Sequence, residues 1–136
     1  MKVFRQGDTY IAPKGAFFDG NVKLDGHFIA PPDTHVWGKL VIGGRLELGP
    51  RSSVGGEVLA QSAIIGHGAR IKGPLIVLEN ATVCDDATIH SIQAGGNVVI
   101  RPGVKVGDVT CDETITVYGK IKSGKLVGRN VKIMST

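Results

Sequence analysis

Aromatic side chains and methionine are scarce in this chain of 136 residues, which contains four phenylalanines, two tyrosines, one tryptophan and two methionines. Glycine is abundant instead, with 20 residues. A core with few large rings is built from Val, Ile and Leu, and glycine supplies turns between short segments. This composition favours strands and argues against an ordinary helical domain. The length corresponds to one domain that is large enough to bury a core.

Cysteine is also rare, because only Cys84 and Cys111 occur, far apart in the sequence. Neither belongs to a CxxC motif or to the Cys/His spacing that is typical of a zinc site. We therefore expect neither a metal centre nor a disulfide framework, and predict two free thiols in a reducing cytoplasm.

Targeting and nucleotide-binding motifs are missing as well. No apolar run approaches the roughly 18 residues that span a bilayer, and polar residues follow the first five residues where a signal peptide would have its apolar core. No G-x-x-x-x-G-K-[ST] loop occurs. These features predict a soluble, cytoplasmic protein that needs no cofactor.

Acidic residues are absent after Glu113, although the formal charge of the whole chain is only +4. The same segment carries five cations: Lys120, Lys122, Lys125, Arg129 and Lys132. Such an asymmetry can attract an anionic membrane or a nucleic acid. Because almost no aromatic side chains interleave with these cations, we expect a solvated basic face and no nucleic-acid partner.

What the sequence does contain is a repeat, seen most clearly in residues 65–71. An apolar residue opens this segment, a small or aliphatic residue stands fourth after the opener, and a β-branched residue closes it. The pattern returns in residues 48–54, 83–89 and 100–106, and more weakly in residues 117–123, where Ser123 replaces the closing residue. The closing residues are 17 or 18 positions apart, at Val36, Val54, Ile71, Ile89 and Val106. This period is typical of one coil of a β-solenoid.

A finer spacing of five or six residues divides each coil into three. Between Val36 and Val117 it marks fifteen positions, of which twelve are Val, Ile or Leu; the exceptions are Ala60, Gly95 and Asp112. Three steps per coil indicate three faces. The sequence therefore predicts an all-β, single-stranded, three-sided β-helix of about six coils in residues 16–136, preceded by a leader in residues 1–15.

The alternation of strand side chains predicts which positions face the axis. Two positions before each closing residue, the side chains are expected to point inward: Ser52, Ala69, Ala87, Val104 and Ile121. One position before it, they are expected to point outward: Ser53, Arg70, Thr88, Lys105 and Lys122. Glycine, proline and aspartate mark corners, as in Gly66-His67-Gly68 and Asp85-Asp86.

The leader has two interpretations. It is a weak membrane anchor if Phe4 inserts among lipids and Lys2 and Arg5 contact anionic lipid phosphates at the inner face of the membrane. It is a frayed terminus, an extra edge strand or a cap on the solenoid if no membrane is involved.

Both ends of the predicted solenoid lack an amphipathic helix that would cover the last coil. A bare end exposes unpaired backbone groups and apolar core, which stacking of a second copy would bury. The side chains expected to make these polymer contacts are Phe17, Phe18, Phe28, Leu126, Val131, Ile133 and Met134.

The chain resembles the bactofilins, which are polymer-forming cytoskeletal proteins. The resemblance extends from about Phe17 to Met134 and includes the Phe-Asp-Gly-Asn-Val-Lys-Leu-Asp-Gly phrase that begins at Phe18, the Leu-Glu-Leu-Gly of residues 46–49 and the Val-Gly-Gly-Glu-Val of residues 54–58. It implies a right-handed β-helix that forms non-polar filaments without a nucleotide, often at the membrane through a short N-terminal segment. It also implies a scaffold that is no enzyme, has no small-molecule substrate and has itself as partner.

A second resemblance is to the hexapeptide-repeat proteins, left-handed and trimeric β-helices that include acyltransferases and γ-class carbonic anhydrases. The six-residue spacing and the phrase Ile-Gly-His-Gly-Ala at residues 65–69 are similar to theirs. A zinc site needs converging ligands, and no second ligand closely follows His67. We therefore expect His67 to be an exposed corner residue, Asp85-Asp86 to be an ordinary turn, and Trp37 to pack against Pro31-Pro32, with a partner contact as the alternative for Trp37.

Overall fold

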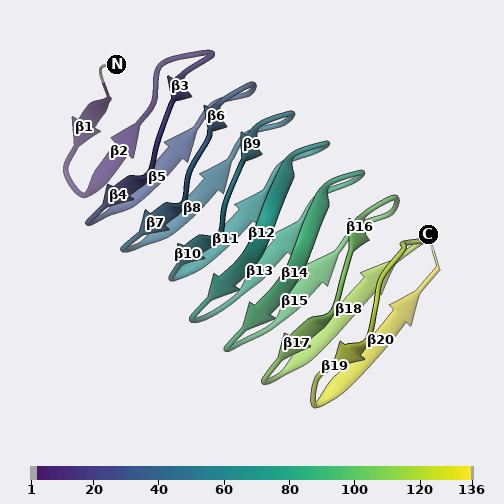
Figure 1. Cartoon of the computed structure of the whole chain (residues 1–136). Helices are drawn as coiled ribbons and strands as arrows, with labels where there is room; N and C mark the ends of the chain where they lie inside the picture. The colour runs from purple at the N-terminus through teal and green to yellow at the C-terminus, as the bar shows by residue number, and fades with distance from the viewer. Residues whose placement is uncertain (1–2, 136) are drawn as a thin grey trace.

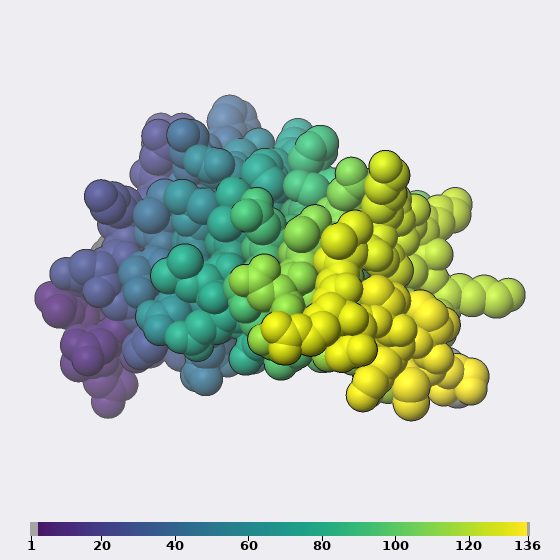
Figure 2. All heavy atoms as spheres, turned by 90° about the horizontal axis from the view of Figure 1, so that it is seen from below, coloured from purple at the N-terminus to yellow at the C-terminus, as the bar shows by residue number. Residues whose placement is uncertain are grey.

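The structure is a computed structural model that describes residues 3–135. All of its regular elements are strands, and the chain winds through about seven turns of a β-solenoid (Figure 1). Successive coils follow the sequence along one axis, so the two termini lie at opposite ends of an elongated molecule (Figure 2). The predicted β-solenoid is confirmed.

The first face is a nine-stranded sheet. Its strands are, in order, β1 (Phe4–Gln6), β2 (Thr9–Ile11), β5 (His27–Ala30), β8 (Arg45–Leu48), β11 (Ser62–Ile65), β13 (Ala81–Val83), β15 (Val98–Ile100), β18 (Thr114–Tyr118) and β20 (Asn130–Met134). Neighbouring strands are parallel, except for the antiparallel pair of β1 and β2. Parallel strands about 4.8 Å apart satisfy each other's backbone groups, so each coil stabilises the next.

The second sheet forms the other two faces. The second face holds β3 (Phe17–Phe18), β6 (His35–Val36), β9 (Ser53–Val54) and β16 (Lys105–Val106). The third face holds β4 (Val22–Leu24), β7 (Leu40–Ile42), β10 (Val58–Ala60), β17 (Val109–Cys111) and β19 (Leu126–Val127). Two longer strands, β12 (Arg70–Val77) and β14 (Thr88–Ala94), run through the corner between these faces, where their pairing changes register after Ile71.

The solenoid has about seven turns where about six were expected, because the repeat begins inside residues 1–15. Strand β2 pairs in parallel with His27–Ile29, which lies one coil later in the sequence, and so belongs to the first face. Strand β1 folds back on β2 as an antiparallel hairpin and ends the sheet. The segment expected to be a leader thus supplies β2, the first strand of the first coil, and β1, which pairs with the outer edge of β2.

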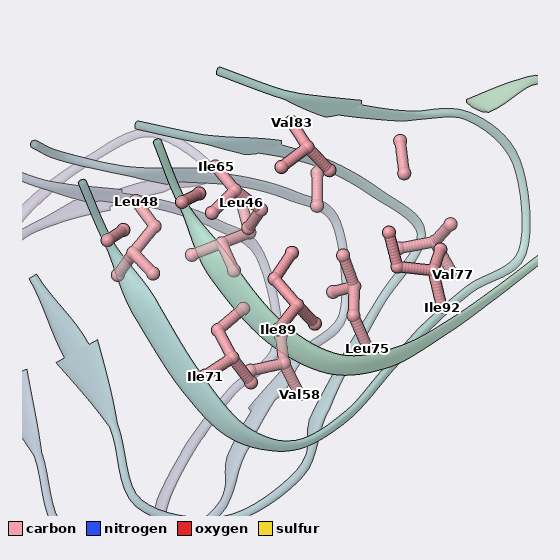
Figure 3. Close-up of a cluster of buried hydrophobic side chains, with 14 of the residues drawn as sticks. Leu46, Leu48, Val58, Ile65, Ile71, Leu75, Val77, Val83, Ile89 and Ile92 are labelled. Carbon is pink, nitrogen blue, oxygen red and sulfur yellow. The ribbon is translucent and has the colours of Figure 1, made fainter. Parts of the chain in front are cut away.

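The core consists of aliphatic columns that run along the axis, with one residue from each coil. One such column contains Leu48, Ile65, Val83, Ile100 and Val117, none of which is more than 2% exposed. Figure 3 shows Leu48, Ile65 and Val83 among the side chains that fill the coil interior. Close packing of equivalent side chains makes every coil depend on its two neighbours.

The inward register differs from the expected spacing at two corners. The spacing placed Gly95 and Asp112 on the inside, but Val77 pairs with Ala94, and Ala94 pairs with Cys111. Ala94 and Cys111 are buried, whereas Gly95 and Asp112 are exposed. The prediction was wrong here because the five-residue step of these coils lies one corner earlier, between the second and third faces.

The predicted small inward column is confirmed. Its buried members are at most 1% exposed: Ser52, Ala69, Ala87 and Val104; Ile121 is partly buried. The polar member is paired, because the Thr34 amide donates a hydrogen bond of 3.0 Å to Ser52 Oγ, and Thr34 Oγ1 donates one of 2.7 Å to the Pro31 carbonyl. The residues predicted to face outward are exposed, with Ser53 half-buried: Ser53, Arg70, Thr88, Lys105 and Lys122.

The corner between the first and second faces places one residue of most coils in the left-handed region. Gly68 and Gly103 adopt it without strain, and Asp33, Arg51 and Asp86 adopt it with φ near 60° (61°, 59° and 61°). Arg51 Nε and Nη2 donate hydrogen bonds of 3.1 and 3.2 Å to the Asp33 carboxylate, and this pairing holds the pKa of Asp33 below its usual value. Adjacent corners are therefore linked by side chains as well as by backbone.

Candidate assembly surfaces at the two ends

The C-terminal end is formed by β20, which pairs with β18 on one side only. Val131 lies next to Ile115 and Ile133 next to Val117, so both continue inward-facing columns. Ile115 and Val117 are buried, whereas Val131 is 42% and Ile133 is 65% exposed. The difference arises because β20 begins a further coil whose other two faces are not formed within the described residues. The apolar interior of the solenoid is consequently open at this end.

Further apolar side chains surround this opening. Leu126 continues the column of Val109 and is partly buried, and the adjacent Val127 is 54% exposed. Met134, which pairs with Tyr118, is 44% exposed. Strands β19 and β20 contact each other, so the four C-terminal residues predicted to make polymer contacts lie at one end of the rod.

The free edge of β20 adds a backbone component to this surface. Five residues of the strand pair with β18, and their other side has no neighbouring strand in the part of the chain that the structure describes. An edge strand of this length with alternating apolar side chains is a template for pairing with another chain. Lys132 is the only charged residue within β20.

The N-terminal end is closed differently, by the β1–β2 hairpin. Arg5 and Tyr10 are directly paired across the hairpin, and the guanidinium carbon of Arg5 lies 5.1 Å from the centre of the Tyr10 ring. The Tyr10 hydroxyl donates a hydrogen bond of 2.6 Å to Asp25 Oδ1. Tyr10 in turn pairs with Phe28, which is fully buried. A charged side chain directed inward from an edge strand is one means by which sheet proteins prevent edge pairing.

The bond between Tyr10 and Asp25 shifts both acid–base equilibria. Accepting this bond lowers the pKa of the Asp25 carboxyl, because the bond stabilises its ionised form. Donating the bond raises the pKa of the Tyr10 hydroxyl, and partial desolvation raises it further. The cap on the N-terminal end is therefore held in part by a hydrogen bond that requires Tyr10 to be protonated and Asp25 to be ionised.

The hairpin covers only the first face of this end. The second and third faces end at β3 and β4, where Phe18 is partly buried and Phe17 is 42% exposed. The Phe18 ring packs edge to face against Phe28 with a centroid separation of 6.5 Å. The N-terminal end thus keeps some accessible apolar surface beside its cap.

One of the residues expected to make polymer contacts is placed elsewhere. Phe28 is 0% exposed because Tyr10 and Phe18 pack on it, so it cannot touch a second copy, and this expectation is corrected. Phe4 is 56% exposed on the outward side of β1. Arg5, expected to contact lipid phosphates, has its guanidinium on the Tyr10 ring, and Lys2 lies outside the described residues.

Three of the four histidines contact a neighbouring coil through their side chains. His27 Nδ1 accepts a hydrogen bond of 2.8 Å from the Arg45 amide, and His35 Nδ1 lies 2.6 Å from Ser53 Oγ. His67 is an exposed corner residue, as predicted, and its Nδ1 lies 3.9 Å from the Asp86 carboxylate.

The acidic corner and the two cysteines do not form a ligand cluster in the described chain. Asp85 forms an ion pair of 3.5 Å with Arg101. Cys84 and Cys111 are free thiols, as predicted, and burial raises the pKa of both. Within residues 3–135, no three His, Cys, Asp or Glu side chains lie close enough together to hold a metal ion.

The sequence reasoning gave a cap as one alternative for residues 1–15 without naming the residues that form it, and it misplaced Trp37. The cap formed by Arg5 and Tyr10 was signalled by the alternating Thr-Tyr-Ile of residues 9–11, which stands one repeat before the His-Phe-Ile of residues 27–29. Trp37 was expected to be buried against Pro31-Pro32, but it is 68% exposed and packs edge to face on Phe17 at 5.2 Å.

No helix in the described part of the chain is long and apolar enough to cross a membrane. Comparison of the sequence and structure with family models, curated proteins and solved structures finds no match of any of the three kinds.

Proposed function

We propose that this protein is a self-assembling scaffold, similar to the bactofilins, whose solenoids stack end to end into filaments without a nucleotide. The observation that carries the proposal is the exposure of Val131 and Ile133, two inward-facing side chains at an end of the core that nothing covers within the described chain. Soluble monomers normally cover such an end, and a second solenoid is a cover of the right shape.

The C-terminal end offers enough apolar surface for a specific contact. Full burial of one aliphatic side chain contributes roughly 1.5 to 3 kcal/mol, and Val127, Val131, Ile133 and Met134 are each at least 42% exposed. Pairing of the β20 edge adds backbone hydrogen bonds along five residues. This end is therefore the stronger of the two contacts in the proposed polymer.

A filament also needs a contact at the N-terminal end. Phe17 and the partly buried Phe18 lie beside the hairpin cap, and together with the free edge of β1 they form the second, weaker surface. If like ends meet, C-terminal contacts and N-terminal contacts alternate and the filament has no polarity; if unlike ends meet, the filament is polar.

The proposal includes a cytoplasmic location and weak attachment to the inner face of the membrane. Phe4 is exposed on the outer side of β1, where it pairs with the half-buried Ile11. One exposed phenylalanine binds a bilayer weakly, and many copies along a filament add their affinities. Sedimentation with phosphatidylglycerol vesicles tests this part: Phe4→Ser should release the filaments from the vesicles.

The scaffold itself is tested by electron microscopy and light scattering of the purified protein without nucleotide. Wild type should form filaments or sheets, and Ile133→Arg should form only short species because a charge replaces an apolar contact. Ile64→Arg is the matched control, since Ile64 is 39% exposed in the middle of the first face. Unchanged filaments in both Ile133→Arg and Phe18→Arg would refute the proposed contacts.

The same samples distinguish the two polymer geometries. With like-end contacts, Ile133→Arg should leave dimers joined at their N-terminal ends and Phe18→Arg should leave dimers joined at their C-terminal ends. With unlike-end contacts, each variant alone should be monomeric and a mixture should form dimers. Compact trimers with stoichiometric zinc would instead favour a hexapeptide-repeat enzyme, the competing proposal.

A further inference from the structure

Trp37, the single tryptophan of the chain, is 68% exposed at the corner between the second and third faces. Its ring is held by an edge-to-face contact with Phe17, with ring centres 5.2 Å apart and an interplanar angle of 74°. Exposed tryptophan is enriched in binding surfaces because it offers a large apolar area and loses little conformational entropy on binding. A fixed, exposed ring on a rigid coil is therefore suited to a ligand.

A groove lies beside this ring on its C-terminal side. The next coil contributes the small residues Ser53 and Gly55 to its lining, and the coil after that forms the opposite wall with Arg70 and Lys72. The hollow has a volume of about 530 Å³, with Val36 and Val54 also among its lining residues. Since its walls stand two coils apart, roughly 10 Å, the groove is wide enough for one extended chain.

Gly55 is necessary for this shape. A Cβ at Gly55 would overlap the carbonyl oxygen of Trp37 in the coil below, so no side chain fits where Lys72 stands one coil further on. The groove runs parallel to the strands because the outward positions of a single coil, Ser53 and Gly55, carry a small side chain or none. We call this feature, formed by Trp37, Ser53, Gly55, Arg70 and Lys72, the Trp37 groove.

The cations of the Trp37 groove have no acidic partner. Neither Arg70 nor Lys72 forms an ion pair with any residue of the described chain, whereas the nearby Lys39 is paired with Glu57 at 3.3 Å. One wall therefore offers an aromatic ring and the other two uncompensated positive charges. A complementary ligand carries an apolar group for the ring and, on its opposite side, one or two carboxylates for Arg70 and Lys72.

We propose that the Trp37 groove binds an extended acidic peptide segment of a partner protein, with an apolar side chain on the Trp37 ring and carboxylates on Arg70 and Lys72. The floor is recessed behind the walls, which a flat bilayer does not reach. The single aromatic ring favours a short peptide segment over a single-stranded nucleic acid, whose successive bases stack on several rings.

The inference does not rest on filament formation, since three successive coils of one chain supply every groove residue. In an assembly the groove would recur once in each copy, so a partner with several such segments would bind with increased avidity.

The test is a selection of random heptapeptides displayed on phage against the whole wild-type protein, with Trp37→Ala as the counter-selection target. Peptides enriched on wild type should contain Asp or Glu next to an apolar residue. A selected peptide without tryptophan should then change the fluorescence of Trp37 in a saturable way, because this ring is the only indole in the protein. Circular dichroism checks that each variant is folded.

Two charge variants separate specific binding from general attraction. Arg70→Gln with Lys72→Gln should weaken the peptide about tenfold or more, since both carboxylate contacts are lost. Lys105→Gln with Lys122→Gln removes the same charge from exposed positions further along the second face and should change the affinity less than about twofold. An equal loss in both variants would overturn the proposal. Absence of acidic enrichment would also overturn it, as would tighter binding of oligothymidylate or phosphatidylglycerol vesicles.

Discussion

The two ends of the solenoid differ in whether a further element covers the inward-facing side chains of the last coil. At the N-terminal end, the inward column of the first face finishes with Tyr10, which is covered by Arg5 and tied to Asp25. At the C-terminal end, the equivalent column finishes with Val131, which is 42% exposed. An aliphatic residue in an inward register is therefore no guarantee of burial. What decides its exposure is whether a further element crosses the end of the coil.

This contrast suggests a division of roles. The hairpin with its inward-directed arginine reduces edge pairing at one end, whereas the open core and five-residue edge at the other end favour it. Side chains at the N-terminal cap should therefore contribute mainly to the stability of the single chain. Side chains of β20 should contribute mainly to association.

The largest expected effect compares two isoleucines in one inward column. Ile100→Ala should lower the free energy of unfolding by about 2 to 5 kcal/mol, because Ile100 is fully buried. Ile133→Ala should lower it by less than about 1 kcal/mol in dilute protein, because Ile133 is already 65% exposed. Urea denaturation at low protein concentration measures both. Equal losses would mean that the C-terminal end is closed in solution.

A second, smaller effect is the pH dependence of the N-terminal cap. Folding raises the pKa of Tyr10 above 10.0, its value in the unfolded chain. The resulting stabilisation is complete below pH 10.0 and is lost as the pH rises through the pKa of the folded state. Folding lowers the pKa of Asp25 below 3.8, its value in the unfolded chain. The resulting stabilisation is complete above pH 3.8 and is lost as the pH falls through the pKa of the folded state. Tyr10→Phe should therefore lower the thermal midpoint most at intermediate pH and least at both extremes.

Tyr118, at the other end of the molecule, provides the control for this prediction. Its ring lies under the Arg101 guanidinium at 4.9 Å, and its hydroxyl makes no hydrogen bond within the described chain. Tyr118→Phe should lower the thermal midpoint by a similar, small amount at every pH. A pH-independent loss for Tyr10→Phe as well would show that the bond to Asp25 does not hold the cap.

The smallest expected effect is on association through the N-terminal end. Arg5→Gln removes the cation from the Tyr10 ring and uncovers apolar surface, which should strengthen N-terminal contacts by about tenfold at most. The change is best measured by sedimentation of the Ile133→Arg variant, in which the C-terminal contact is blocked. Weaker association after the change would assign Arg5 to the contact itself.

The solenoid was predictable because its signal is repeated in every coil. Leu48, Ile65 and Val83 recur once per coil at equivalent positions, and each confirms the register of the others. The inward places of Ala94 and Cys111 were not predictable, because the shorter coils can take their five-residue step at any of three corners. The periodicity fixes the length of a coil and leaves the position of that step open.

The candidate surfaces were only partly predictable for a different reason. That Val131 and Ile133 end the chain's last apolar columns can be seen in the sequence, but burial of Phe28 depends on Tyr10, which precedes the repeat that the closing residues define. Exposure of Trp37 depends on Gly55, which stands one coil later in the sequence and leaves the side of the ring open. Such contacts join residues of different coils, so the sequence next to each residue does not predict them.

The residue-for-residue pairing of the coils also determines how this molecule can change in size. Ala63 pairs with Ala81, and Ala81 pairs with Val98, so a whole coil can be duplicated or removed between them without altering either end. Each such change would lengthen or shorten the rod by about 4.8 Å. The length of the rod can therefore change only by whole coils, while the surfaces at its two ends stay the same.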